Sequence, residues 1–69
     1  MMNPVLIGEK LTNLRVESKK SREQVAVAIG CSASAVAMYE TGKRIPRDDV
    51  KLKLAELYGV SIEEIFFAA

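Results

Sequence analysis

Residues 21–42 read SREQVAVAIGCSASAVAMYETG, a stretch that contains the boundaries of two helices. Ser21 and Gln24 form a capping-box pattern, which predicts a helix from that point to Gly30. Ser32 is a second N-cap candidate and predicts another helix from about Ala33 to Glu40. Because only three residues separate the two helices, they must cross steeply.

The rest of the chain also carries helix starts and stops and no alternating strand pattern. An Asn-Pro start predicts a helix from residue 4 to about residue 18, and paired aspartates predict one over about residues 47–58. A last capping box at residues 61–64 opens a short helix through Phe66. The sequence therefore predicts an all-α fold of five short helices around one core, with residues 1–69 as a single domain.

The composition excludes most enzyme classes. The 69 residues include no His and one Cys, so a Ser-His-Asp triad, a Cys-His pair and most zinc sites are impossible. We therefore expect no enzyme, no cofactor and no metal site. A single Cys forms no internal disulfide, and the longest apolar runs have five residues, against about 20 for a membrane span. We expect a cytoplasmic protein that does not contact a membrane.

The charges are unevenly distributed, although the net charge is only +1. Residues 10–53 contain all ten basic residues and five acidic ones, whereas residues 54–69 contain three acidic residues and no basic one. A basic body with an acidic end is typical of a small nucleic-acid binder.

The chain resembles the XRE family of helix-turn-helix regulators, the lambda-repressor and Cro type, from about residue 7 to residue 66. The matching motifs are residues 7–11 (IGEKL), 14–15 (LR), 21–26 (SREQVA), 29–32 (IGCS), 36 (V), 39–43 (YETGK), 46 (P), 54–55 (LA) and 59–66 (GVSIEEIF). Residues 45–55 are similar to regulators of Gram-positive phages and mobile elements. The resemblance implies a lambda repressor-like domain whose helix-turn-helix unit covers about residues 21–40.

The resemblance implies that the helix from Ala33 to Glu40 enters the major groove of DNA. Its groove-facing residues would be Ala33, Ser34, Ala37 and Met38. These side chains offer one hydroxyl and no Arg, Asn or Gln for bidentate base recognition. Specificity could instead come from DNA shape, or from Arg22, Thr41 or Lys43 at a base edge. The same bare face also allows the alternative that DNA recognition has been lost.

Five residues near the ends of the two helices are expected to contact phosphates. Arg22 stands where the family usually has Gln, at the start of a helix, and Lys43 and Arg44 follow the recognition helix. Ser21 and Ser32 are helix caps first and candidate phosphate contacts second. The candidate phosphate-binding residues are thus Ser21, Arg22, Ser32, Lys43 and Arg44.

Two further groups have expected structural roles. The resemblance implies that Arg15 and Glu40 form a partly buried ion pair between two helices. The apolar C-terminal end suggests a two-fold dimer, since exposed apolar surface usually marks an interface. Its expected interface residues are Leu57, Ile62, Phe66 and Phe67, although a frayed and partly exposed end is an alternative.

The leading interpretation is a dimeric, sequence-specific repressor of transcription that binds double-stranded DNA at a roughly palindromic operator. The alternative is a protein-interaction module that keeps the fold and binds a protein partner, such as an antirepressor, a polymerase or a toxin, through the 33–40 helix. The bare Ala/Ser/Met face favours the second interpretation, and the retained Arg22, Lys43 and Arg44 favour the first.

Overall fold

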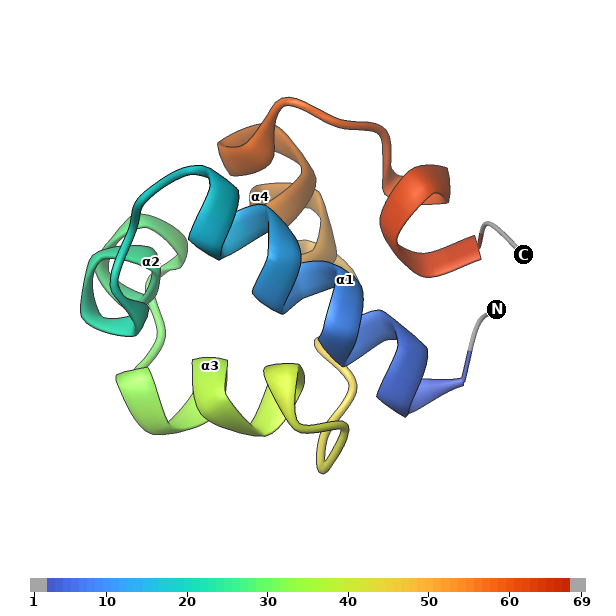
Figure 1. Ribbon diagram of the computed structural model, residues 1–69, viewed down its shortest axis with the longest axis horizontal. Helices are drawn as coiled ribbons and strands as arrows, with labels where there is room; N and C mark the ends of the chain where they lie inside the picture. Colours follow the sequence, from blue (N-terminus) through green and yellow to red (C-terminus); the bar gives the residue numbers. More distant parts are fainter. Residues whose placement is uncertain (1–2, 68–69) are drawn as a thin grey trace.

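The computed structural model describes residues 3–67, which fold into five helices (Figure 1). These are α1 (Pro4–Glu17), α2 (Arg22–Ile29), α3 (Ala33–Glu40), α4 (Asp48–Tyr58) and η1 (Glu63–Phe67). The described residues contain no strand, so the predicted all-α fold is confirmed. None of the helices described is long and apolar enough to cross a membrane.

The boundaries of α2 and α3 follow from local hydrogen bonds. The Ser21 hydroxyl accepts from the backbone N–H of Gln24, and the Gln24 side chain accepts from the backbone N–H of Ser21, so the capping box is present. Gly30 closes α2 in the left-handed conformation, with φ of 72°. The Ser32 hydroxyl then accepts from the backbone N–H of Ala35 and opens α3.

Two helix ends differ from the expectation. Helix α4 begins at Asp48, because Arg47 occupies the N-cap position with an extended backbone. The last helix is π-helical rather than α-helical, so its side chains follow a wider period than the sequence pattern assumed.

The core lies where α1, α2, α3, α4 and η1 meet. Its largest fully buried side chains are Ile7, Val25, Ile29, Ile65 and Phe66. Phe66 has no exposed surface at all, so a partner chain cannot contact it in this conformation. The expectation that Phe66 lies in a dimer interface is therefore wrong, because the π-helical turn directs this ring into the protomer's own core.

Helix α1 crosses the end of α3 at very close range. A Cβ atom placed on Gly8 would contact the backbone oxygen of Glu40, and it would lie 2.7 Å from the Glu40 carbonyl carbon and 2.9 Å from the Tyr39 oxygen. Backbone on the opposite side cannot move away as a flexible side chain can. Gly8 is thus the residue that allows α1 to fix the position of α3.

Lys51 links α4 to the C-terminal turn. Its ammonium group lies 5.5 Å from the ring centroid of Phe66 and 5.9 Å from that of Phe67, and its side chain is largely buried. These cation–π contacts hold η1 against α4.

Candidate nucleic-acid interface

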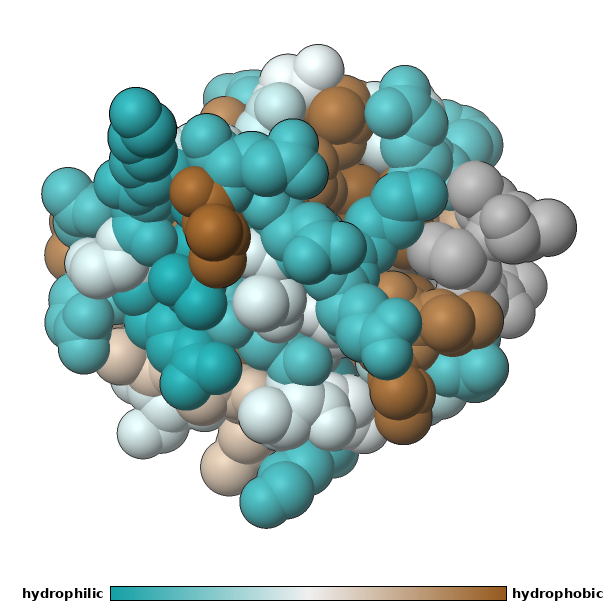
Figure 2. Space-filling view, in the orientation of Figure 1, coloured by the Kyte–Doolittle hydropathy of each residue, from teal (hydrophilic) through white to brown (hydrophobic). Residues whose placement is uncertain are grey.

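Helix α3 has an inner and an outer side of different chemistry. Ala35, Val36, Tyr39 and Glu40 are buried against the rest of the protein. The outer side contains Ala33 and Ala37, which are half-buried, and Ser34 and Met38, which are exposed. The lower edge of Figure 2, over α3, is mostly white and tan, as expected for small side chains of intermediate hydropathy. The four expected groove-facing residues therefore lie on one accessible face.

The expected phosphate contacts fall into two groups around α3. Ser21 and Arg22 lie at the start of α2, whereas Ser32, Lys43 and Arg44 lie at the start of α3 and in the loop after it. Both serine hydroxyls already accept a backbone N–H as caps. Among the described residues neither hydroxyl donates a hydrogen bond, so both hydroxyl hydrogens are available to an anion.

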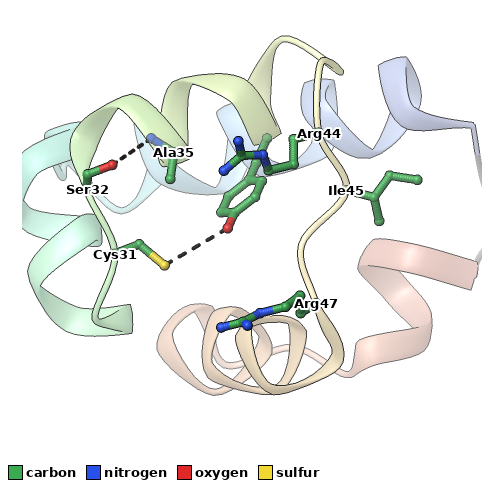
Figure 3. Close-up of a pocket in the computed structure, with 7 residues that line it drawn as sticks. Cys31, Ser32, Ala35, Arg44, Ile45 and Arg47 are labelled. Atoms are coloured by element: carbon green, nitrogen blue, oxygen red, sulfur yellow. Dashed lines mark hydrogen bonds between the residues drawn. The ribbon is translucent and has the colours of Figure 1, made fainter.

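A pocket of about 460 Å³ brings three chain segments together beside the first turn of α3 (Figure 3). It is lined by Cys31, Ser32, Ala35, Tyr39, Arg44, Ile45 and Arg47. Arg44 and Arg47 supply positive charge from the loop before α4. Arg47 was not among the expected contacts, because the sequence pattern placed it in the first turn of a helix, whereas it is in fact the N-cap of α4.

The Tyr39 hydroxyl lies 4.0 Å from the Cys31 sulfur, and both residues line this pocket. Burial and the neighbouring Cys31 raise the pKa of Tyr39, with Arg44 and Arg47 opposing the shift. Tyr39 therefore stays neutral and closes the inner wall of the pocket.

A second cluster joins three helices through the Glu40 carboxylate. Arg15 Nε lies 2.7 Å and Arg15 Nη2 lies 3.2 Å from the two carboxylate oxygens. Arg22 Nε donates to the same carboxylate at 3.0 Å. The Glu40 side chain is 2% exposed, against 16% for Arg15 and 41% for Arg22. Arg15 also donates to the backbone oxygen of Lys20 and so fixes the loop between α1 and α2.

The bond from Arg22 to Glu40 was not foreseen. The expected partner of Glu40 was Arg15, and Arg22 was expected to contact only DNA, at a phosphate or at a base edge. Nothing local predicts the additional contact, because the two residues are 18 positions apart.

Charge and burial also affect the groups around Glu40. The hydrogen bond to Glu40 is the main cause that raises the pKa of Arg15. Burial, with the negative charge of Glu40 as the second cause, raises the pKa of Tyr58 to about 12. The folded protein therefore favours the neutral, protonated form of the Tyr58 side chain.

This shift predicts an alkaline limit to stability. An unfolded tyrosine titrates near pH 10, so the contribution of Tyr58 is complete below about pH 10 and is lost as the pH rises toward about 12. We expect the free energy of unfolding of the wild type to fall more steeply across this range than that of Tyr58→Phe. Urea unfolding at a series of pH values measures both, and parallel pH profiles would contradict the assignment.

The expected dimer residues other than Phe66 lie at or near the surface. Leu57 and Ile62 are half-buried at the edge of the core, and Phe67 is 52% exposed. These three remain available to a second chain.

Comparison with known proteins agrees with this geometry. A family model for the helix-turn-helix domain matches residues 6–65, which include all five helices except the ends of the first and last. The chain belongs to the helix-turn-helix domain family. The resemblance to XRE regulators is therefore confirmed.

Two curated relatives of the domain are named as transcriptional repressors. The cryptic phage CTXphi repressor RstR of Vibrio cholerae is 37% identical over 60 residues, covering 87% of this chain and 54% of RstR. The repressor RghR of Bacillus subtilis is 36% identical over 63 residues, covering 90% of this chain and 47% of RghR. The chain thus spans about half the length of these relatives.

A solved structure of similar size shares the fold. The restriction-modification controller protein C.AhdI from Aeromonas hydrophila is 32% identical and superposes with a TM-score of 0.83. The match covers 90% of this chain and 94% of that one. The shared helix-turn-helix fold therefore accounts for nearly the whole of the C.AhdI chain.

Proposed function

We propose that this helix-turn-helix domain is a DNA-binding transcriptional repressor that inserts α3 into the major groove. The observation that carries the proposal is the outer face of α3, which is accessible, built of small side chains and flanked by cations. Arg22 lies at one side, and Lys43, Arg44 and Arg47 follow the helix. The relatives named as repressors support this function for the chain.

The chemistry of α3 indicates how DNA is recognised. Ala33, Ala37 and Met38 offer apolar contacts to thymine methyl groups, and Ser34 offers a hydroxyl. Because small side chains allow close approach without bidentate base contacts, phosphate contacts fix the position of the helix on the duplex and DNA shape supplies much of the specificity.

We further propose that the active form is a two-fold dimer. Leu57, Ile62 and Phe67 form its contact surface, and Phe66 supports them from inside the core. Such a dimer places two α3 helices about 34 Å apart, so that each occupies one half-site of a palindromic operator.

A binding selection from a random duplex pool at near-physiological salt tests the function directly. Enrichment of a two-fold symmetric motif with half-sites about one turn apart would support the dimeric repressor. Recovery of no motif would contradict sequence-specific binding. The bare face of α3 would then favour docking of a protein partner, the second candidate function.

The phosphate contacts predict a strong dependence on salt. If Arg22, Lys43 and Arg44 each meet one phosphate, a dimer makes about six contacts, and log affinity falls with log salt at a slope of roughly −5. Changing both Lys43 and Arg44 to alanine should weaken binding to all sequences and reduce that slope. A flat salt response of the wild type would contradict the phosphate contacts.

A further inference from the structure

We propose that Glu40 is a positioning residue for DNA binding: its carboxylate holds Arg22 by Nε and leaves the terminal amino groups of that guanidinium to bind a backbone phosphate. The proposal rests on the proposed function and adds a role for a buried acid at the end of the recognition helix. It concerns a contact that depends on the arginine this chain has at position 22.

The distribution of donors separates the two arginines. Arg15 gives Nε and Nη2 to Glu40 and Nη1 to the backbone oxygen of Lys20, so each of its nitrogen atoms has a partner within the protein. Arg22 gives only Nε to Glu40. Within residues 3–67, neither of its terminal nitrogen atoms has a hydrogen-bond partner, and the side chain is 41% exposed. All three side-chain nitrogen atoms of Arg15 are therefore bonded within the protein, whereas Arg22 uses one and has two available to a ligand.

The charges point in the same direction. One carboxylate faces two guanidinium groups, so the cluster of Arg15, Arg22 and Glu40 keeps one positive charge. The more exposed member is Arg22, the first residue of α2, where the helix dipole also favours an anion. A planar guanidinium can keep one hydrogen bond through Nε while its two amino groups bind a phosphate oxygen pair.

Glu40 also links this contact to base recognition. It is the last residue of α3, and its side chain is 2% exposed. The same carboxylate that anchors the end of α3 therefore fixes the distance from the Arg22 guanidinium to the outer face of that helix.

The proposal predicts that removing the Glu40 charge weakens DNA binding, whereas simple electrostatics predicts that it strengthens binding. Removing an acidic charge from a protein that binds DNA ordinarily strengthens binding, because the phosphates are negative. If Glu40 positions Arg22, however, Glu40→Gln should weaken binding. Glu23 provides the matched control: it is exposed, lies in the same first turn of α2, and has no bond to Arg22 in the part of the chain described.

The test measures binding of the full chain to a mixed-sequence duplex of about 24 base pairs from about 50 to about 300 mM KCl. Because a dimer loses two phosphate contacts when one residue is changed, the magnitude of the slope should fall by about 1.8, and affinity at near-physiological salt should fall about 30-fold. We expect Glu40→Gln and Arg22→Ala to show the same loss, and the double variant to show no further loss. Glu23→Gln should bind more tightly than the wild type.

Two additional variants remain informative if Glu40→Gln is poorly folded by circular dichroism. Arg22→Lys keeps the positive charge but lacks the forked donor, and Glu40→Asp keeps the negative charge but shortens the side chain. Both are expected to reduce affinity and slope as Arg22→Ala does. The ¹⁵N resonance of Arg22 Nε reports the hydrogen bond without DNA, and it should shift in Glu40→Gln but not in Glu23→Gln.

The outcomes separate this proposal from the function on which it rests. Wild-type protein that binds DNA, together with a folded Glu40→Gln variant that binds as tightly or more tightly, would overturn the positioning role and leave the function intact. Additive losses in the double variant would also overturn it. A wild type that binds no duplex even at the lowest salt would overturn the proposed function and the positioning role together.

Discussion

Gly8→Ala is expected to destabilise the protein by about 3 kcal/mol, although alanine normally stabilises a helix relative to glycine by about 1 kcal/mol. The reason is the contact of α1 with the end of α3. The added methyl group would lie 2.7 Å from the carbonyl carbon of Glu40 and within 3 Å of the Tyr39 oxygen, both of which are backbone atoms. Separating the two helices would also lengthen the hydrogen bonds from Arg15 to Glu40.

Asn13→Ala is the control for this prediction. Asn13 is exposed on the same helix, so its replacement by alanine should leave stability unchanged or raise it slightly. Urea unfolding followed by circular dichroism measures both variants. A Gly8→Ala protein as stable as the wild type would show that α1 and α3 can separate at little cost.

Phe66→Ala is expected to cost about 4 kcal/mol, because it removes a completely buried aromatic ring from the centre of the core. For a domain of this size that is a large part of the total stability. The variant should be mostly unfolded well below the melting temperature of the wild type. A modest shift in the midpoint would mean that η1 contributes little to the core.

The adjacent Phe67 separates folding from association. Phe67→Ala removes an exposed ring and one cation–π contact with Lys51, so we expect a loss of about 1 kcal/mol or less in the free energy of unfolding. If Phe67 belongs to the dimer surface, sedimentation should show a weaker dimer for this variant. An unchanged dimer would place the two-fold contact elsewhere.

The helix boundaries could be predicted because their causes are local. The capping box at Ser21 and Gln24, the left-handed Gly30 and the cap at Ser32 each depend on residues within four positions. The outer residues of α3 could also be predicted to share one face, because the helical period fixes which side chains lie on the same side of a helix.

The remaining features depend on tertiary contacts that no local pattern reports. Arg22 was visible as a cation at a helix start, but its bond to Glu40 exists only because α2 and α3 pack together. Phe66 and Phe67 are chemically identical neighbours, and the π-helical turn decides which one is buried. Arg47 joins the pocket only because of the path of the loop after α3.

The division of α3 into an anchored side and an accessible side has a consequence for redesign. Ala35, Val36, Tyr39 and Glu40 attach the helix to the domain, whereas Ser34 and Met38 are exposed and Ala33 and Ala37 are half-buried. Longer polar side chains such as Asn, Gln or Arg can therefore be introduced at the exposed positions 34 and 38 with little loss of stability. Selection from a library varied at these exposed positions of α3 can therefore give the domain a new DNA sequence preference.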